Sequence, residues 1–391
     1  MAEVKKCGNC LLPETYETLV IDQDGQSCNM CKTSQFKKTS VDWPKRKKML
    51  DEVIEKYRGK YDYDCVVPFS GGKDSTYTLY YLLKEYKIKP LVVRFDHGFM
   101  RSNHEKNVIT VLKNMGADFI SFKPNWKIVK KLMWEAFSRK TDFCWHCHTG
   151  IYSYPLQIAL KFNVPLILWG EPLAEMSAYY TYEEDLIEWE DEEKFNMVRN
   201  LGITADDMWG MINTEKEPID KRELLPYTYP NLKELKKMDY YSVCLGSFIP
   251  WDYKANTKII MDELGWTGDE LEGVPDSINK EFAKIECWMQ GTRDYIKYLK
   301  RGYSRVTQLT NFEIRNDRMT TAEAQEWINN FEGLKPHSLE VFLEYMGITE
   351  KEFNETIAKF VVAPFEPDFE NIKQGTKPHD FHEWYREKTV R

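Results

Sequence analysis

Short apolar runs alternate with amphipathic stretches between residues 64 and 171. The runs have the length of strands and are apolar at most positions, as is typical of strands buried on both faces. The stretches between them repeat apolar residues at helical spacing. The predicted strands are 64–69, 90–96, 117–123 and 164–171, and the predicted helices are 74–86, 105–116 and 151–163.

This alternation predicts the fold class of the middle of the chain. Strand–helix–strand repetition with buried strands forms a parallel sheet that helices cover on both faces. We therefore expect a doubly wound α/β domain that binds its ligands at the carboxyl ends of the strands.

The pattern changes on both sides of this domain. A cysteine-rich segment precedes it, and mostly helical patterns follow it, with a capping-box pair at Thr320 and Glu323 and two short helices that meet at Gly347. The stretch 182–195 is strongly acidic and is expected to be an exposed insertion. The predicted regions are a ribbon at 1–40, a linker helix at 41–60, the α/β domain at 61–260 and a mainly helical region at 261–391.

Charge and composition narrow the classes of function. The net charge of -8 argues against a protein that holds nucleic acid through its bulk charge, although one focused pocket can still bind a small anion. No apolar run approaches the length of a membrane span, and the first residues show no apolar signal segment. We therefore expect a cytoplasmic protein with no membrane partner.

Four of the nine cysteines form two C-x-x-C pairs in the pattern C-x2-C-x17-C-x2-C. Asp24 and Gly25, in the spacer, are a turn signal that fits a short hairpin. Four thiolates in such an arrangement saturate a tetrahedral Zn²⁺ site, so the segment is predicted to be a structural zinc ribbon. The predicted ligands are Cys7, Cys10, Cys28 and Cys31.

A glycine-rich loop, "SGGKDS" at 70–75, joins the first predicted strand to its helix. It is not a Walker A loop, because Val67 occupies the first glycine position of that motif and Asp74 stands where a magnesium-binding hydroxyl is needed. Its place between strand and helix still offers backbone N–H groups to an anion. The Asp74 carboxylate fits beside phosphates if Mg²⁺ lies between them; otherwise it caps the helix.

The same loop resembles the S-G-G-x-D-S signature of the PP-loop ATP pyrophosphatases, the superfamily of GMP synthetase, argininosuccinate synthetase and the tRNA thiolases. The resemblance implies an adenine nucleotide alpha hydrolase-like fold whose loop holds the β,γ-pyrophosphate of ATP. A substrate oxygen is adenylylated, pyrophosphate leaves, and a nitrogen or sulfur nucleophile then displaces AMP. The implied ATP-binding residues are Ser70, Gly71, Gly72, Lys73, Asp74, Ser75, Phe95, Asp96 and Gly170.

A narrower resemblance covers nearly the whole chain. The ribbon, the PP-loop, "DFCWHCHTGIY", "WGEP", "LGSFIPWDYKANTKII" and "GYSRVTQLTNFEIRNDRMT" occur in the order that is typical of the N-acetyl sugar amidotransferase family of bacterial surface-polysaccharide (LPS O-antigen) biosynthesis. This resemblance implies that ATP and ammonia convert an acetamido group on a nucleotide-activated sugar, expected to be a UDP-diacetamido uronic acid, into an acetamidino group. It also implies two partners, a glutaminase subunit and a cyclase-like subunit, that supply the ammonia.

Four further side chains are candidates for substrate chemistry. Lys254 in "WDYKANT" could neutralise phosphate, and Glu171 ends a predicted strand, where a parallel sheet presents its ligands. Together with Asp74, these two are the predicted catalytic residues. Arg305 and Arg315 are predicted to pair with the diphosphate or a uronate carboxylate of the sugar nucleotide. For each of the four, a surface salt bridge is the alternative.

A second group of cysteines is open to three interpretations. Cys144 and Cys147 flank "WH", and Cys244 lies at another expected strand end. Three thiolates could hold a [4Fe-4S] cluster with one open iron, as in the tRNA thiolases that share the loop, or a second zinc with His146 or His148. In the third interpretation they are separate packing residues.

Two other functions compete with sugar amidotransfer. A PP-loop tRNA sulfur transferase would use the second group of cysteines, but the acidic charge and the lack of a recognisable RNA-binding module argue against it. A zinc-ribbon scaffold whose loop only binds nucleotide within a complex would release neither AMP nor pyrophosphate.

Overall fold

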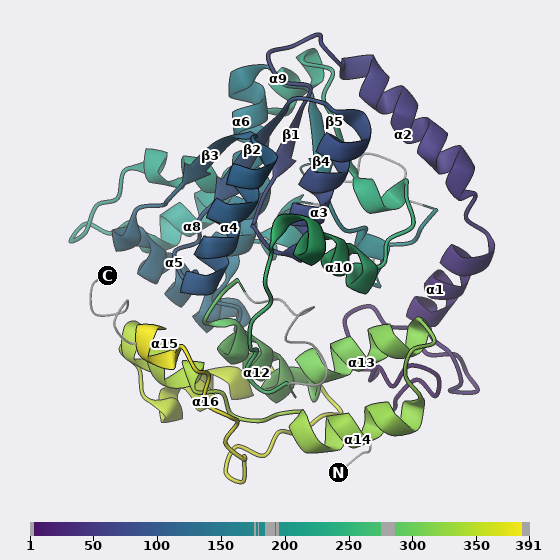
Figure 1. Ribbon diagram of the computed structural model, residues 1–391. Coiled ribbons are helices and arrows are strands. Elements are labelled where there is room, and N and C mark those ends of the chain that lie inside the picture. Colours follow the sequence, from purple (N-terminus) through teal and green to yellow (C-terminus); the bar gives the residue numbers. More distant parts are fainter. Residues whose placement is uncertain are drawn as a thin grey trace. The chain divides into compact units, whose positions relative to one another are not determined.

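The computed structural model describes residues 4–175, 177–178, 180–183, 192, 195–274 and 286–384 (Figure 1). The chain divides into two compact units. The helical unit is Met1–Val41, Ala174–Tyr182 and Gly268–Arg391, and the α/β unit is Asp42–Leu173 and Glu183–Thr267. The predicted ribbon therefore shares a unit with the C-terminal region, and the predicted linker helix belongs to the α/β unit.

Five parallel strands form one sheet in the described part of the α/β unit, in the order β3-β2-β1-β4-β5. This confirms the predicted parallel sheet, and the strand expected to end at Cys244 is its fifth member. The strands are β1 (Cys65–Pro68), β2 (Pro90–Phe95), β3 (Asp118–Phe122), β4 (Leu166–Trp169) and β5 (Tyr241–Cys244).

The strand order reverses between β1 and β4. From β1 the chain adds β2 and β3 on one side, and it then returns to place β4 and β5 on the other side. Because crossovers between parallel strands are right-handed, the connections before and after this reversal lie on opposite faces. The carboxyl ends of β1 and β4 are therefore the place where a sheet of this topology binds its ligands.

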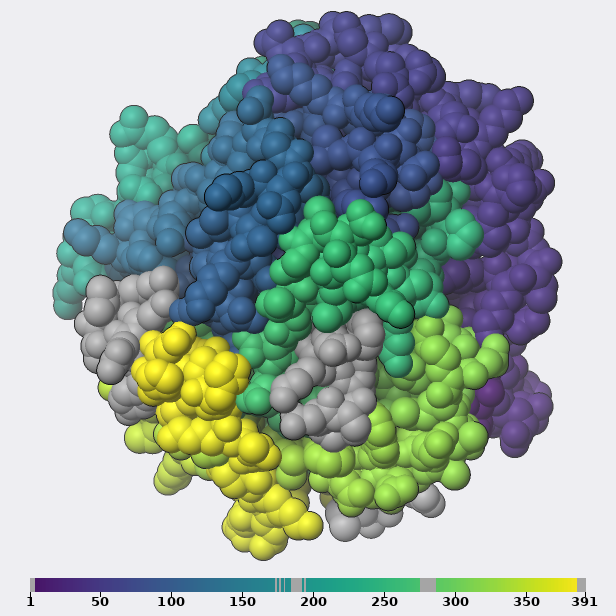
Figure 2. Space-filling model, viewed as in Figure 1, coloured from purple at the N-terminus to yellow at the C-terminus, as the bar shows by residue number. Residues whose placement is uncertain are grey.

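Helices cover the sheet and set the surroundings of these strand ends. Helix α3 (Lys73–Tyr81) packs on β1 and β4, and α10 (Tyr253–Leu264) packs against α3. Helix α6 (Trp145–Phe162) packs on β2 and β1. Figure 2 shows α4 (Ser102–Met115) beside α10 at the surface.

The remaining helices of the α/β unit connect and flank these elements. One of them, α5 (Trp126–Lys140), was not predicted from the sequence pattern. Helix α6 was predicted to begin at residue 151, but it begins at Trp145. The further helices are α2 (Trp43–Tyr57), α5 (Trp126–Lys140), α8 (Ala205–Ile212) and α9 (Leu232–Lys237), with π-helical turns at Leu82–Tyr86 and Phe195–Arg199 and 3-10 turns at Leu173–Glu175, Lys221–Tyr227 and Leu245–Ser247.

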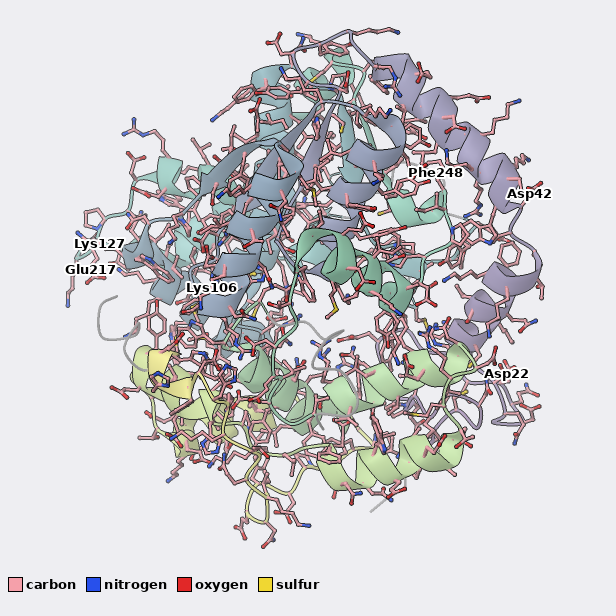
Figure 3. All side chains as sticks on the ribbon, viewed as in Figure 1. Asp22, Asp42, Lys106, Lys127, Glu217 and Phe248 are labelled. Atoms are coloured by element: carbon pink, nitrogen blue, oxygen red, sulfur yellow. The ribbon has the colours of Figure 1, made fainter. Side chains whose placement is uncertain are left out.

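The core of the α/β unit is apolar, and its surface carries charge. Phe248 is fully buried, whereas Lys106, Lys127 and Glu217 are exposed (Figure 3). Within the core, the β2 residue Phe95 contacts α6 so closely that a Cβ on Gly150 would lie 2.4 Å from its ring. Gly150 is therefore required for this packing rather than for backbone freedom.

The described part of the helical unit contains no named strand and consists of loops and helices. The capping box of Thr320 and Glu323 is confirmed, and so is the boundary at Gly347 between two short helices. Helices α13 and α14 lie side by side (Figure 1). The helices are α1 (Asn29–Thr39), α12 (Gln290–Arg301), α13 (Arg305–Arg315), α14 (Thr321–Phe331), α15 (Ser338–Met346) and α16 (Glu350–Ala358).

The sequence also led us to expect an exposed acidic insertion and no membrane-spanning segment. Most of the acidic stretch 182–195 lies outside the described residues. Among the residues that are described, no helix is both long and apolar enough to cross a bilayer.

The contact between Gly150 and Phe95 predicts opposite effects for two glycine substitutions in helices. Gly150→Ala should destabilise the protein, because overpacking costs about 1–3 kcal/mol and outweighs a helix-propensity gain of about 0.5–1 kcal/mol. Gly210→Ala, in α8 with nothing within 4 Å of the new Cβ, should gain only the propensity. The urea midpoints of unfolding measure the stability change of each variant. A Gly150→Ala protein at least as stable as the Gly210→Ala protein would contradict the close contact between Gly150 and Phe95.

Candidate functional site

The loop 70–75 lies between the end of β1 and the first turn of α3. Its hydroxyl and N–H groups gather in one place: Ser70 Oγ and Ser75 Oγ are 3.2 Å apart, Gly71 N donates to Ser75 Oγ at 3.2 Å, and Gly72 N donates to Ser70 Oγ at 3.2 Å. The first turn of a helix adds further N–H groups that lack intrahelical acceptors. These donors make the loop suited to an anion.

Lys73 and Asp74 add opposite charges at the start of α3. The two side chains form an ion pair, and both are largely buried. Lys73 Nζ also lies 5.8 Å from the centre of the Tyr253 ring, at the start of α10. Because the paired lysine can compensate the Asp74 carboxylate, that carboxylate can be retained next to an anion.

Two other predicted residues, Gly170 and Glu171, follow the end of β4 and lie near the loop. Gly170, after β4, is so close to α3 that a Cβ there would lie 2.6 Å from Thr78 Oγ1 and 3.2 Å from the Asp74 carbonyl oxygen. Glu171 follows it and is half-buried. The segment after β4 thus reaches the first turn of α3.

Lys254 lies in the first turn of α10 and is half-buried. The nearby Asp252 caps this helix by accepting from Lys254 N at 2.9 Å and Ala255 N at 3.3 Å. The cap fixes the start of α10, and Tyr253 between them contacts Lys73. Lys254 is therefore placed on a well-anchored turn beside the loop.

Two residues that the sequence analysis did not single out contact the loop directly. His104 Nε2 lies 2.7 Å from the Ser70 carbonyl oxygen, and Trp266 Nε1 donates to the Gly71 carbonyl oxygen at 3.1 Å. They come from α4 and from the segment after α10, far from the loop in sequence. No local motif marks them, because only the fold brings them to the loop.

Phe95 and Asp96, predicted to line the nucleotide site, are both buried. Phe95 belongs to an aromatic core in which its ring centroid lies 5.8 Å from that of Phe122 and 5.7 Å from that of Tyr227. Asp96 accepts from Gly98 N at 2.8 Å and pairs with Lys123 at 3.1 Å. These contacts give both residues a structural role at the end of β2.

Charge holds the Asp96 carboxyl in its ionised form. Burial raises the pKa of this carboxyl, but the Arg94 guanidinium 3.6 Å away, the Gly98 N–H and Lys123 together outweigh burial and leave the pKa below its usual value. Burial has the opposite consequence for the neighbouring His97, where it lowers the pKa to about 3. The end of β2 therefore combines an ionised carboxylate with a neutral imidazole.

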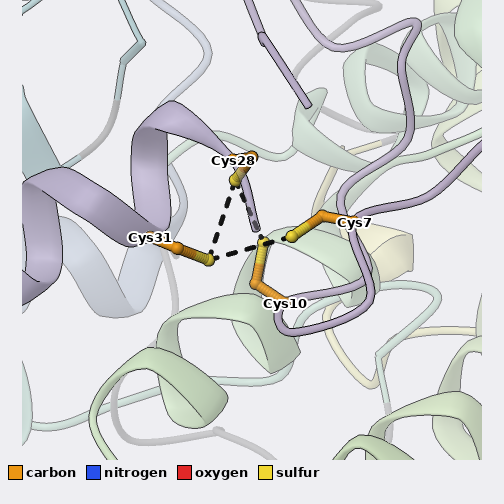
Figure 4. A group of neighbouring side chains, drawn as sticks. All are labelled: Cys7, Cys10, Cys28 and Cys31. Carbon is orange, nitrogen blue, oxygen red and sulfur yellow. Dashed lines mark hydrogen bonds between the residues drawn. The ribbon is translucent and has the colours of Figure 1, made fainter. Parts of the chain in front are cut away.

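The four cysteines of the predicted ribbon converge in the helical unit (Figure 4). The Sγ–Sγ distances are 3.9 Å for Cys7–Cys31, 3.6 Å for Cys10–Cys28 and 3.7 Å for Cys28–Cys31. A tetrahedral zinc with Zn–S bonds of about 2.3 Å requires sulfurs about 3.8 Å apart. The four buried sulfurs therefore fit a structural Zn²⁺ ion.

Backbone contacts hold the two C-x-x-C turns together. Cys7 N donates to Leu12 O at 2.9 Å, Gly8 N donates to Gly25 O at 2.8 Å, and an antiparallel bridge pairs Ile21 with Cys28. Hydrogen bonds among the four thiols couple their protonation, lowering the pKa of Cys7 and Cys31 and raising the pKa of Cys10 and Cys28. The four sulfurs therefore act as one closely packed group.

Cys144, Cys147 and Cys244 do not form a comparable group. In the part of the chain that the structure describes, the first four cysteines are the only set of three or more His, Cys, Asp or Glu ligand atoms within 4.8 Å of one another. The nearby His146 has its Nε2 3.4 Å from the His97 carbonyl oxygen, and burial lowers its pKa to about 4. The observed arrangement therefore gives no support to a second metal site.

The two arginines predicted to bind substrate have different surroundings within the helical unit. Arg305 pairs with Asp294 through two N–O contacts of 3.1 Å and lines a small pocket together with Tyr295 and Ser304. Arg315 is buried and donates to Asn311 Oδ1 at 2.7 Å and to a backbone carbonyl at 3.3 Å. Arg305 is thus the one of the two that faces a pocket.

Comparison with known proteins identifies the region around this pocket. Residues 281–388 match the family model described as "LPS biosynthesis protein WbpG-like, C-terminal domain". This region of the chain is therefore similar to the C-terminal domain of WbpG-like LPS biosynthesis proteins. This confirms the family resemblance drawn from the order of the sequence segments, and it assigns helices α12–α16 to the WbpG-like domain.

Two curated proteins are similar to part of this chain. An uncharacterized protein of Methanocaldococcus jannaschii is 25% identical over 217 residues, which cover 52% of this chain and 76% of the relative. The glutamine-hydrolysing GMP synthase of Plasmodium falciparum is 33% identical over 112 residues, 27% of this chain but only 18% of the synthase. The chain therefore spans less than a fifth of the synthase that it resembles.

The sulfur geometry predicts the metal content of the protein. The purified chain should carry about one zinc per molecule without visible absorption, and Cys10→Ser should lose the zinc and unfold at lower urea, because a structural zinc contributes folding energy. Cys287→Ser changes a thiol outside the four-cysteine group and should keep the metal. Elemental analysis measures the zinc content, and a visible spectrum shows whether an iron–sulfur cluster is present. Full zinc content in the Cys10→Ser protein would contradict the four-cysteine site.

Proposed function

We propose that this protein is an ATP-dependent amidotransferase that acts on a nucleotide-activated N-acetyl sugar. The observation that carries the proposal is the "SGGKDS" loop, whose N–H and hydroxyl donors meet at the carboxyl end of β1, where the strand order reverses. The WbpG-like domain supports a role in polysaccharide biosynthesis. The partial similarity to GMP synthase supports the use of ATP.

The proposed chemistry begins at the acetamido oxygen of the sugar. An amide carbon is a poor electrophile, so its oxygen attacks the α-phosphorus of ATP, the bond to the β-phosphate oxygen breaks, and pyrophosphate leaves. Ammonia then adds to the activated carbon, the C–O bond to AMP breaks, and loss of a proton leaves an acetamidino group. The loop 70–75 retains pyrophosphate as the leaving group, and bound Mg²⁺ would neutralise charge on its oxygens.

Three side chains have proposed roles in this sequence of steps. Asp74 is the candidate ligand for Mg²⁺, because it lies in the first turn of α3 beside the phosphate donors. Lys254, one residue from the ring that contacts Lys73, neutralises charge on the phosphates. Glu171 follows Gly170 next to α3 and is proposed to accept the proton released when ammonia adds.

The helical unit supplies the remaining proposed parts. Arg305 is proposed to contact the sugar nucleotide, since its guanidinium lines the pocket of the WbpG-like domain. The contacts of Arg315 with Asn311 and the backbone favour a structural role for it. The zinc ion would hold the two C-x-x-C turns together. The protein would act in the cytoplasm, where a glutaminase subunit and a cyclase-like subunit would supply ammonia.

A tRNA sulfur transferase is the less supported alternative. It needs three cysteine ligands for an iron–sulfur cluster, and the described residues Cys144, Cys147 and Cys244 are not gathered in a ligand group. Release of AMP with tRNA and a sulfur donor, together with no product from ammonium and any sugar nucleotide, would reverse this ranking.

Mass spectrometry of the substrate tests the proposed reaction and the role of Lys254. The protein is incubated with ATP, Mg²⁺, ammonium and a panel of diacetamido sugar nucleotides. One of these sugar nucleotides should lose the mass difference between O and NH, because an acetamido oxygen is replaced by nitrogen. Lys254→Ala should lower kcat/KM for ATP about 100-fold, as expected for the loss of one charge contact to the transition state. Lys258→Ala, an exposed lysine one turn further along α10, should retain activity. Equal activity of the two variants would contradict the role of Lys254.

A further inference from the structure

Two carbonyl groups of the loop accept hydrogen bonds from side chains that are distant in sequence, and the Gly71 carbonyl also accepts a longer bond of 3.4 Å from Thr76 Oγ1. His104 Nε2 contacts the Ser70 carbonyl oxygen at 2.7 Å, and Trp266 Nε1 contacts the Gly71 carbonyl oxygen at 3.1 Å. A carbonyl oxygen only accepts hydrogen bonds, so the imidazole carries a proton on Nε2 in this contact. His104 and Trp266 are almost completely buried. Both contacts are therefore protected from competition with water.

These two contacts also fix the direction of two N–H groups. In a planar trans peptide the C=O and the following N–H point in opposite directions. Holding the Ser70 carbonyl therefore directs Gly71 N–H to the other side of the loop, and holding the Gly71 carbonyl does the same for Gly72 N–H. On that side the N–H groups meet the Ser70 and Ser75 hydroxyls. The Gly71 and Gly72 N–H groups therefore point away from the Ser70 and Gly71 carbonyls.

Glycine makes such anchors necessary. Because it adopts positive and negative φ almost equally well, a peptide group beside it can turn over at little conformational cost. A reversed peptide would present a carbonyl oxygen to the anion and repel it. Gly71 has φ of +83°, and a Cβ there would lie 2.3 Å from Val108 and 3.1 Å from the His104 ring. The sequence thus needs glycine at this position, and the glycine needs an external constraint.

Helix α4 supplies one anchor and secures the other. His104 lies on α4, and so does Asn107, which donates from Nδ2 to the Thr267 carbonyl oxygen at 2.7 Å and accepts from Thr267 N at 3.0 Å. Asn114, two turns further on, donates to the Leu264 carbonyl oxygen at 3.1 Å. These bonds hold the backbone on both sides of Trp266. One helix therefore determines the position of both donors.

We propose that His104 and Trp266 are positioning residues that select the backbone orientation in which Gly71 and Gly72 bind the departing pyrophosphate. The inference rests on the proposed function, because pyrophosphate is the ligand that the loop would retain. Neither side chain touches this ligand. Each acts through one peptide group of the loop.

Calorimetric titration of the full chain with inorganic pyrophosphate and Mg²⁺, and separately with AMP, tests this role. Trp266→Phe removes the N–H and keeps an aromatic ring, so pyrophosphate binding should weaken about 3- to 10-fold, as expected for one hydrogen bond. AMP binding, which does not use the loop, should not change. Trp209→Phe is the matched control, because Trp209 Nε1 donates at 2.8 Å to Ile219 O, outside the loop.

A second pair of variants separates the hydrogen bond from simple packing. His104→Leu removes the donor and should weaken pyrophosphate binding by a similar factor, whereas His104→Gln retains a donor and should recover most of the affinity. Pyrophosphate affinities equal to that of the unmodified chain in both Trp266→Phe and His104→Leu would overturn the inference. Equal losses for AMP and pyrophosphate would also overturn it, since they indicate a general folding defect. An unmodified chain that binds no pyrophosphate would refute the proposed function itself.

Discussion

The hydrogen bonds from His104 and Trp266 to the backbone of the loop 70–75 fix the direction of its N–H groups, and the candidate site is arranged around that direction. A buried strand leads into the loop, and α3 leads out of it with further N–H groups in its first turn. The reversal of strand order beside β1 leaves this edge of the sheet open to a ligand. The fold thus presents several donors and the Lys73 charge to one anion.

The helical unit has its own organising contacts. Four buried sulfurs at zinc-binding distances hold the first segment of the chain together, and the WbpG-like domain contributes a pocket with the Arg305–Asp294 pair. In the proposed reaction, Arg305 of this unit would contact the sugar nucleotide. The α/β unit carries the loop that resembles the PP-loop of ATP pyrophosphatases.

The sequence predicted the features that depend on local pattern. Apolar runs predicted the parallel strands, glycines beside a lysine predicted the anion loop, and cysteine spacing predicted the four-sulfur site. It did not reveal His104 or Trp266, because their role depends on tertiary contacts with a loop that is distant in sequence. Phe95 also needed the structure, since a strand-end aromatic can line a pocket or fill a core, and here it contacts Gly150 in the core.

If the loop retains pyrophosphate, ATP is cleaved at its α-phosphorus. Phosphorus NMR of the reaction with ATP, Mg²⁺, ammonium and the accepted sugar nucleotide shows which bond breaks. We expect AMP and pyrophosphate in equal amounts, formed in step with the acetamidino sugar. Formation of ADP and phosphate instead would contradict this expectation, because the bond broken would then lie at the γ-phosphorus.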